Sequence, residues 1–409
     1  MTLRVLDRPA IERLEAGGGA ILIALSGGGD SMALLHLLVE ALGASKLRAA
    51  VIDHGLRAGS ARDARRAADF AEALGVAAEV IALTWREGES RAQEAARLAR
   101  YDALCAAARR LGGQVIAAAH TADDQAETVF MRAASGSSWR GLAAMNACAP
   151  APVWPQGRGL VLVRPLLSAR RADLRDMLRA RGAAWIDDPA NANEAFARVR
   201  ARKRLAELEA AGFDSMRLAL LAAKLRPLAH AIDAEAAGLI ARAVRIEGEA
   251  MHLSLAAWRG GGEARRRALS VLIAAAAGAG REPGAGLARL EARLAEDGFR
   301  GASLGGARLA RAGGAIMIGR DRGALSGRAD GAKQLAPLAL APGVETVWDG
   351  RLALTAAALG WSVSAGARGV ELARAGEVLA LEQAREQGIV QAHWLVETHV
   401  AHRLGAFLP

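Results

Sequence analysis

Residues 21–38, ILIALSGGGDSMALLHLL, decide the fold: five mostly apolar residues end at a glycine run, and an apolar helical pattern follows. The pattern predicts a strand over 21–25 and a helix over 32–42. Glycines permit positive φ, so consecutive backbone N–H groups can face one concavity, and the helix adds its positive N-terminal end. We therefore expect the pyrophosphate of a nucleotide to bind at Ser26, Gly27, Gly28, Gly29, Asp30 and Ser31.

The acid in this loop carries a second implication. Asp30 beside a phosphate would be repelled unless a cation lay between them, which points to a magnesium ion. The loop is neither GxGxxG nor GxxxxGK[ST], so dinucleotide and Walker-type sites are disfavoured. The alternative is a purely structural glycine turn, capped by Ser26 or Asp30.

The first 190 residues alternate short apolar runs with amphipathic helical patterns. Strands are expected at 21–25, 49–53, 79–83, 114–118 and 160–164, and helices at 32–42, 61–74, 91–111 and 123–134. This order predicts an α/β fold with a doubly wound, mostly parallel, Rossmann-like sheet. In such sheets the ligand crevice lies at the carboxyl ends of the strands.

Two further polar clusters follow expected strands. Asp53 and His54 end the second strand, and His120, Asp124 and Glu127 follow a later one. Because carboxyl ends of parallel strands share one edge, we expect both clusters to meet the glycine loop there. A histidine beside acids suits general-base or magnesium chemistry. The alternatives are a helix-capping turn after Asp53 and an acidic helix N-terminus that favours the macrodipole at 123–127.

The pattern changes along the rest of the chain. Residues 149–159, APAPVWPQGRG, predict a surface loop, residues 194–296 read as almost purely helical, and glycine-punctuated short runs after 298 suggest hairpins. We therefore expect a catalytic domain at 1–210, a helical domain at 211–298 and a small, reduced α+β domain at 299–409.

Composition narrows the class of protein. The 409 residues are 52% hydrophobic and 23% charged, with no apolar run of membrane-spanning length and with acids near the start, so we expect a soluble cytoplasmic protein without a membrane partner. The net charge is +10, and residues 164–226 hold 14 basic against eight acidic residues. This patch, which includes Arg164, Arg170, Arg171 and Arg202, favours a polyanionic partner. Arginine-rich codon usage is the alternative, and the sequence does not decide the oligomeric state.

The motifs together resemble a known family. SGGGDS after an apolar strand is similar to the pyrophosphate loop of the PP-loop enzymes, or N-type ATP pyrophosphatases. In order, SGGGDS, VIDHGLR (51–57), RLARY (97–101) and HTADDQAET (120–128) resemble the tRNA(Ile)-lysidine synthases. SGSSWRGLAAM (135–145) and WIDDPANANEAFARVRARKRL (185–205) fit the same family, so the resemblance covers about residues 18–210.

The resemblance implies a ligase that uses ATP and Mg²⁺. It would adenylate O2 of the wobble cytidine in tRNA(Ile) with a CAU anticodon, and the ε-amine of L-lysine would then displace AMP to form lysidine. The implied catalytic residues are Asp30, His120, Asp124 and Glu127, with Asp30 and Asp124 on the metal and with Asp53 and His54 joining the loop in ATP binding. The resemblance also implies that the helical domain at 211–298 contacts the tRNA. The implied tRNA-contacting residues are Arg97, Arg100, Arg198, Arg200, Lys203 and Arg204. Val199 departs from the family's R-N-R pattern, which leaves charge but weakens a base-specific role there.

Other functions remain open. A related PP-loop enzyme could adenylate a tRNA for amination or thiolation, or adenylate a small carbonyl compound. Thiolation needs reactive cysteines, and the chain has only Cys105 and Cys148 with no C-x-x-C pair. A basic RNA-binding protein with a structural glycine loop is the alternative from another class.

Overall fold

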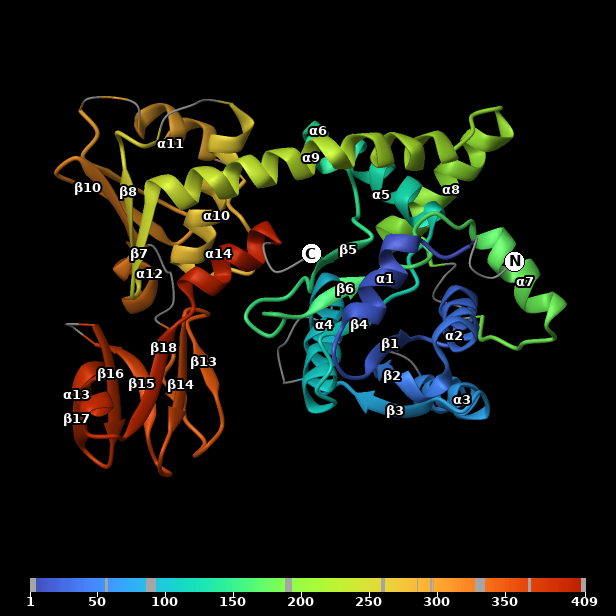
Figure 1. Ribbon diagram of the computed structural model, residues 1–409, viewed down its shortest axis with the longest axis horizontal. Helices are drawn as coiled ribbons and strands as arrows, with labels where there is room; N and C mark the ends of the chain where they lie inside the picture. The colour runs from blue at the N-terminus through green and yellow to red at the C-terminus, as the bar shows by residue number, and fades with distance from the viewer. Residues whose placement is uncertain are drawn as a thin grey trace. The chain divides into compact units, whose positions relative to one another are not determined.

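The computed structural model describes residues 5–55, 58–85, 93–187, 193–258, 262–284, 286–294, 296, 298–327, 335–366 and 369–405 (Figure 1). The chain divides into two compact units, one running to His230 and the other from Ala231 onward. Helix α9 (Met216–Ala243) contains this boundary. Each unit has its own sheet and its own hydrophobic core. No helix in the described ranges is both long and apolar enough to cross a membrane.

The first unit is built on a six-stranded sheet in the order β3-β2-β1-β4-β6-β5. Every neighbouring pair is parallel except β5 with β6. This confirms the expected doubly wound, mostly parallel sheet. The strands are β1 (Ile21–Leu25), β2 (Leu47–Asp53), β3 (Ala77–Ala82), β4 (Val115–Ala117), β5 (Cys148–Pro150) and β6 (Val161–Val163).

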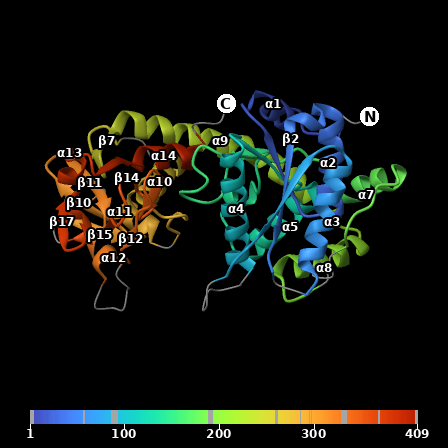
Figure 2. The same ribbon diagram turned by 90° about the horizontal axis from the view of Figure 1, so that it is seen from below.

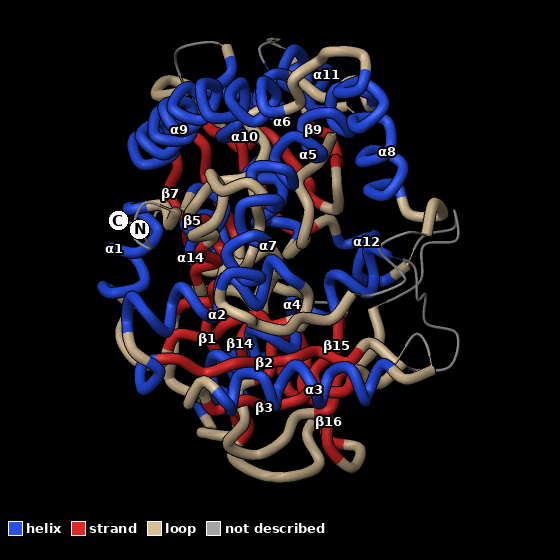
Figure 3. The backbone as a smooth tube through the Cα atoms, turned by 90° about the vertical axis from the view of Figure 1, so that its right-hand side faces the viewer, coloured by secondary structure: helices blue, strands red, loops and turns tan. Residues whose placement is uncertain are grey.

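Helices cover both faces of this sheet. Figure 2 shows α4 on one face and α2 and α3 on the other, and α7 lies beside α2 (Figures 1 and 3). The connections between parallel strands therefore use the helices that the sequence predicts between them. The helices are α1 (Arg8–Ala16), α2 (Gly29–Leu42), the short 3-10 helix η2 (Ala44–Lys46), α3 (Ser60–Ala73), α4 (Gln93–Arg110), α5 (Ala122–Ala134), α6 (Trp139–Leu142), α7 (Arg171–Ala180) and α8 (Ala197–Ala210).

Apolar side chains between the sheet and α4 form the core that fixes the strand ends. Leu22 on β1, Leu104 on α4 and Ile116 on β4 are completely buried in one cluster. A buried side chain of this size contributes roughly 1.5–3 kcal/mol to stability. Both faces of β1 are covered, which explains its nearly continuous apolar sequence. The polar residues that follow β1 and β4 are therefore held by rigid elements.

The stretch 149–159 differs from the expected surface loop. It begins within β5, which pairs antiparallel with β6, and the side chains of Ala151 and Val153 are buried. Proline and glycine residues form the turn in this stretch, but the apolar residues between them pack into the core of the first unit. The proline and glycine content of residues 149–159 therefore predicts the turn correctly but gives no indication of strand β5.

The second unit begins with a five-stranded antiparallel sheet in the order β7-β8-β11-β10-β9. Its strands are β7 (Val244–Glu247), β8 (Ala250–Ser254), β9 (Gly301–Leu304), β10 (Ala307–Ala312) and β11 (Ala315–Arg320), and its helices are α10 (Glu263–Ala277), α11 (Leu287–Leu294) and α12 (Arg322–Ser326). The β7–β8 hairpin lies inside the stretch that reads as helical. Its alternating burial, with Met251 and Leu253 inward, is too short a pattern to stand out in sequence.

Two smaller sheets complete the second unit. One has the order β12-β15-β16-β17 and the other β13-β14-β18. Glycine-punctuated hairpins are thus present after residue 298, as the sequence predicts. The elements are β12 (Leu338–Ala339), β13 (Thr346–Trp348), β14 (Leu352–Ala356), β15 (Ser362–Gly366), β16 (Gly369–Arg374), β17 (Glu377–Ala380), α13 (Leu381–Glu386), β18 (Val390–Trp394) and α14 (Val396–Leu404).

Candidate active site

A cavity of about 440 Å³ opens at the carboxyl ends of β1 and β4. These two strands are neighbours in the sheet, and the strand order reverses between them. Crevices at such a switch point are the usual ligand sites of doubly wound sheets. The loop after β1 forms one wall with Ser26, Gly28, Gly29, Asp30 and Ser31, and the segment after β4 forms another with Ala118, Ala119, His120 and Asp124.

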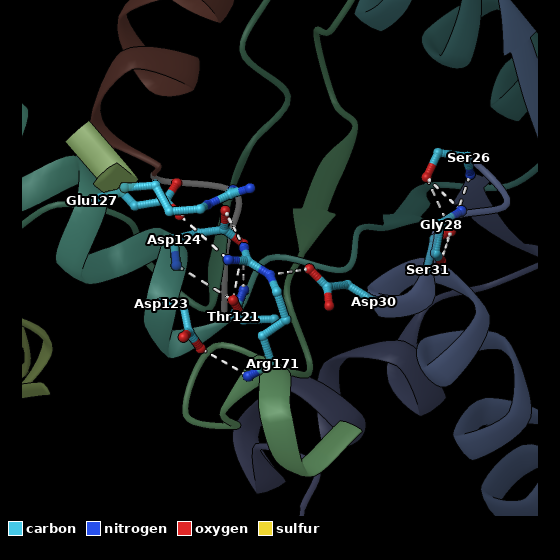
Figure 4. Close-up of polar contacts among 10 residues, drawn as sticks. Ser26, Gly28, Asp30, Ser31, Thr121, Asp123, Asp124, Glu127 and Arg171 are labelled. Atoms are coloured by element: carbon cyan, nitrogen blue, oxygen red, sulfur yellow. Dashed lines mark hydrogen bonds and ion pairs between the residues drawn. The ribbon is translucent and has the colours of Figure 1, made fainter. Parts of the chain in front are cut away.

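Hydrogen bonds inside the glycine loop hold it in one conformation (Figure 4). Ser31 Oγ donates to the Gly28 carbonyl at 2.9 Å and accepts from the Ser26 backbone N–H at 3.2 Å. The cap residue Gly28 has no side chain to satisfy the first N–H groups of α2. These N–H groups lie at the cavity wall and, together with the helix dipole, form a binding surface for an anion.

Gly27 has a structural part in this loop. Its φ is +79°, and it does not line the cavity. A Cβ there would lie 2.8 Å from Ile186 Cδ1 and 2.9 Å from Ala67 Cβ. Only glycine combines this backbone conformation with so close an approach.

Three carboxylates beside the loop share one arginine, Arg171 (Figure 4). Its Nε lies 2.8 Å from Asp30 Oδ2, its Nη2 3.1 Å from Asp124 Oδ1 and its Nη1 3.3 Å from Glu127 Oε1. Glu127 Oε1 also lies 2.8 Å from Arg202 Nε. From the sequence, Arg171 and Arg202 are expected to belong to a basic patch that binds a polyanion. In the structure, both arginines form ion pairs with acidic side chains.

The surroundings of Asp30 and Asp124 shift the pKa values of these two carboxyl groups in opposite directions. Burial raises the pKa of Asp30 above its ordinary value. Burial would also raise the pKa of Asp124, but the charge of Arg171 and the Thr121 backbone N–H hold it below its ordinary value. Asp124 is therefore ionised at neutral pH. Thr121 and Asp124 form a capping box at the start of α5, which fixes the carboxylate in place.

Two histidines near the strand ends are neutral. Burial and the charge of Arg164 lower the pKa of His120 well below its usual range. Burial and Arg100 likewise lower the pKa of His54. His120 Nδ1 is buried and has no hydrogen-bond partner in the described part of the chain, so it remains available as an acceptor.

Arginines form the positive side of the site. Arg100 and Arg198 line the cavity, while Arg97 and Arg100 each lie 5.1 Å from the centre of the Tyr101 ring. Burial and neighbouring arginines, including Arg97 and Arg198, lower the pKa of Arg132. The mutual repulsion of these guanidinium groups makes the region favourable for an anion.

Other residues singled out from the sequence lie away from the cavity wall. Glu127, Asp53, His54 and Arg97 do not line it, and Asp53 Oδ1 accepts from the Gly55 N–H at 2.9 Å in a tight turn. The basic residues of α8 are engaged locally: Arg200 donates to the carbonyls of Glu194 and Ala195, Lys203 pairs with Glu194 and Arg204 pairs with Glu207.

Several cavity residues are not among the site residues expected from the sequence, although four of them lie in the family-like stretch 185–205: Arg171, Arg175, Ile186, Asp187, Phe196 and Arg202. They follow α6 in the chain and reach the site only through the packing of α7 and α8. Helix α7 lies beside α2, and α8 packs against α5. Only the density of positive charge over 164–226 hinted at the arginines among them.

The donor atoms fit a magnesium ion that is shared with a substrate. Within the described ranges, no group of three or more His, Cys, Asp or Glu residues is arranged to hold a metal ion alone. Asp30 Oδ1 is buried at the cavity wall and has no hydrogen-bond partner among the described residues. Mg²⁺ commonly takes one or two carboxylates and completes its shell with phosphates and water. Both Asp124 oxygens are already bonded, Oδ2 to Thr121 and Oδ1 to Arg171, so Asp30 is the better placed of the two expected ligands.

Comparison with known proteins gives one consistent result. Residues 7–209 match the family model of the PP-loop domain. A tRNA(Ile)-lysidine synthase of Hyphomonas neptunium is 38% identical over 70% of this chain and 77% of its own length, and that of Caulobacter vibrioides is 37% identical over 88% and 78%. The corresponding Ruegeria pomeroyi protein is 46% identical over 52% of this chain, and the match covers 49% of its length.

Proposed function

The chain belongs to the tRNA(Ile)-lysidine synthase family, and we propose that it joins L-lysine to C2 of the wobble cytidine in tRNA(Ile) with a CAU anticodon. ATP is consumed, and AMP and pyrophosphate are released. The observation that carries this proposal is the cavity between β1 and β4. It brings the amide-rich loop, a neutral histidine, an ionised aspartate and five arginines to one place.

In the first step, cytidine O2 attacks the α-phosphorus of ATP. A bond forms between O2 and this phosphorus, and the bond from the phosphorus to the bridging oxygen of pyrophosphate breaks. The N–H groups at the start of α2, beside Gly28 and Gly29, bind the leaving pyrophosphate. Asp30 Oδ1 would hold a Mg²⁺ ion here, and the ion would supply positive charge that the backbone N–H groups alone do not.

In the second step, the lysine ε-amine attacks C2 and the bond from C2 to the AMP oxygen breaks. The attacking amine must first lose a proton. His120 Nδ1 and Glu127 Oε2 are buried acceptor atoms without partners in the described part of the chain. Burial lowers the pKa of His120, so the residue is neutral at physiological pH but is a weak base, and it needs the nearby negative charge of Asp124 to accept a proton. Asp124, ionised beside it, stabilises the resulting imidazolium.

Arginines that line the cavity bind the tRNA near the reacting base. Arg198 and Arg100 border the cavity from α8 and α4, so each can reach a phosphate of a nucleotide that enters it. Lys203 and Arg204 lie farther along α8 and pair with acids on the surface. We assign to them a weaker, non-specific contribution to the binding of the tRNA backbone.

The thiols argue for a nitrogen nucleophile over sulfur transfer. Burial raises the pKa of the Cys105 thiol to about 12 and also raises that of Cys148. Neither forms the thiolate that sulfur transfer needs at neutral pH. This favours lysidine formation over thiolation by a relative with the same ATP chemistry.

The test is AMP release measured with purified tRNAs. We expect release that requires L-lysine, Mg²⁺ and tRNA(Ile) with CAU, and no release with elongator methionine tRNA. Asp30→Asn should abolish pyrophosphate release, while Asp69→Asn, at an exposed aspartate on α3, serves as the matched charge-loss control. Equal release with methionine tRNA would contradict the stated specificity, and release without any tRNA would indicate a small-molecule ligase.

A further inference from the structure

Arg171 lies at the centre of the acidic cluster, which we define as Asp30, Asp124 and Glu127 (Figure 4). Each carboxylate contacts a different nitrogen of the guanidinium, at 2.8, 3.1 and 3.3 Å. The Arg171 backbone N–H donates to Asp123 Oδ2 at 2.8 Å, which fixes the start of α7 against α5. The arginine is thus tied to both elements that carry the carboxylates.

The Arg171 guanidinium donates to one carboxylate oxygen of each acid and does not contact the second oxygen of Asp30 or of Glu127. Asp30 is bonded through Oδ2 and Glu127 through Oε1, while Asp30 Oδ1 and Glu127 Oε2 are buried without partners in the described residues. A planar fork of five donors can hold several carboxylates in a fixed relation, which an ammonium group cannot do. Arg171 therefore helps to fix the positions of both open oxygens, together with Arg202 at Glu127.

When the cavity holds no ligand, the positive charge of Arg171 offsets the repulsion among the carboxylates of the acidic cluster. The side chains of Asp124 and Glu127 are 10% and 2% exposed, and Arg171 itself is 15% exposed. Like charges at such depth repel one another strongly without a counter-ion. Among the described residues, Arg202 contacts only Glu127 of the three acids, so Arg171 is the counter-ion that all three share. A divalent cation at the same carboxylates would be repelled by the guanidinium.

We propose that Arg171 is the resident cation of the acidic cluster and prevents a divalent ion from binding there until a nucleotide supplies phosphate charge. Arg171 and Asp30 both border the cavity, so nucleotide phosphates that enter it lie within reach of the guanidinium. The phosphates then offset its charge, and the metal enters together with ATP. Arg171 is a positioning residue in this scheme. The inference rests on the proposed ATP chemistry but concerns the nucleotide-free protein.

The test measures Mn²⁺ binding to the full chain by electron paramagnetic resonance, first without nucleotide. We expect Arg171→Met to bind Mn²⁺ at least 10-fold more tightly than the wild type. Arg171→Lys keeps the charge but cannot bridge three acids, so we expect it to bind about 3-fold more tightly. Arg179→Met is the matched control on the same helix, because Arg179 is exposed and its contacts, an ion pair with Asp176 and a cation–π contact with Trp185, do not involve the acidic cluster; its affinity should equal that of the wild type.

The second readout is the effect of a non-hydrolysable ATP analogue. The analogue should increase the Mn²⁺ affinity of the wild type by at least 10-fold more than it increases that of Arg171→Met. Wild-type affinity without nucleotide equal to that of both Arg171 variants would overturn the proposal. If Arg171→Met fails to fold, as judged by circular dichroism, Arg171→Lys decides the question in the same way. These experiments measure metal binding and not lysidine formation, so they can contradict the role of Arg171 without contradicting the proposed function.

Discussion

The backbone N–H of Ile186 donates to the carbonyl oxygen of Gly27 at 2.8 Å, and the Ile186 side chain lies against the same glycine. This contact joins the loop after β1 to the segment after α7. Both segments contribute to the cavity wall, the first through Gly28 and the second through Ile186 and Asp187. The shape of the phosphate-binding loop thus depends on residues that lie far away in the sequence.

Gly27→Ala should therefore destabilise the protein. An alanine at φ +79° costs about 1–2 kcal/mol, and its Cβ would overlap Ile186 and Ala67. We expect the free energy of unfolding, measured with urea, to fall by about 2 kcal/mol or more. Gly28→Ala is the control, since its φ is −70° and the nearest atom to a Cβ is 3.5 Å away. Equal stability of the two variants would contradict the packing described for Gly27.

Thr121→Val tests the capping box that holds Asp124. Thr121 Oγ1 accepts from the Asp124 N–H at 3.3 Å and donates to Asp124 Oδ2 at 3.0 Å, and valine can do neither. Loss of an N-cap of this kind costs about 1 kcal/mol. We expect that loss in urea unfolding, together with a lower rate of AMP release because Asp124 is less firmly placed. An unchanged rate would show that the position of Asp124 does not limit the reaction.

Arg198→Met and Arg204→Met should separate the cavity from the surface of α8. Arg198 lines the cavity, whereas Arg204 is exposed and pairs with Glu207 at 2.7 Å. We expect Arg198→Met to lower the tRNA-dependent rate at least 10-fold, and Arg204→Met to stay within about 2-fold. In Arg198→Met, the slope of the logarithm of tRNA affinity against the logarithm of salt concentration should become shallower by roughly one. The reverse order of effects would place the tRNA contact on the exposed face of α8.

His399 should make stability dependent on pH. Its burial, with Arg403 and His402 nearby, lowers its pKa to about 2, so the folded protein keeps it neutral while the unfolded chain protonates it below about pH 6.5. Stability from this group is complete above pH 6.5 and is lost as the pH falls. The slope is at most about 1.4 kcal/mol per pH unit. Urea unfolding at pH 7 and pH 5.5 should show a smaller loss in His399→Gln, and identical losses would contradict the assignment.

The sequence predicts the first unit well because its helices and strands have strong, different periodicities. The expected strand at 21–25 matches β1, and the expected helix at 123–134 differs from α5 by one residue. Strands β5 and β7 escape prediction because Pro150 ends β5 and helical sequence precedes β7, whereas the similarly short β4 and β6 lie within the apolar runs 114–118 and 160–164. The pairing of β5 and of β7 depends on contacts across a hairpin rather than on local preference.

The candidate site is predictable where chemistry follows a strand directly. The glycine loop and His120 come immediately after β1 and β4, and the parallel sheet brings them together. Arg171 begins a helix that no catalytic motif announces, and its three partners lie on α2 and α5. Its charge suggested nucleic acid when read from the sequence, because an arginine paired with acids and one that faces a phosphate look the same there.

The most direct measurement is mass spectrometry of the wobble nucleoside after incubation of the protein with tRNA(Ile) bearing CAU, ATP, Mg²⁺ and isotopically labelled L-lysine. The proposed function predicts that cytidine at this position gains the labelled lysine with loss of one water, and that Asp30→Asn yields unmodified cytidine. An unmodified wobble cytidine with the folded wild-type protein, or a sulfur in place of lysine, would contradict it.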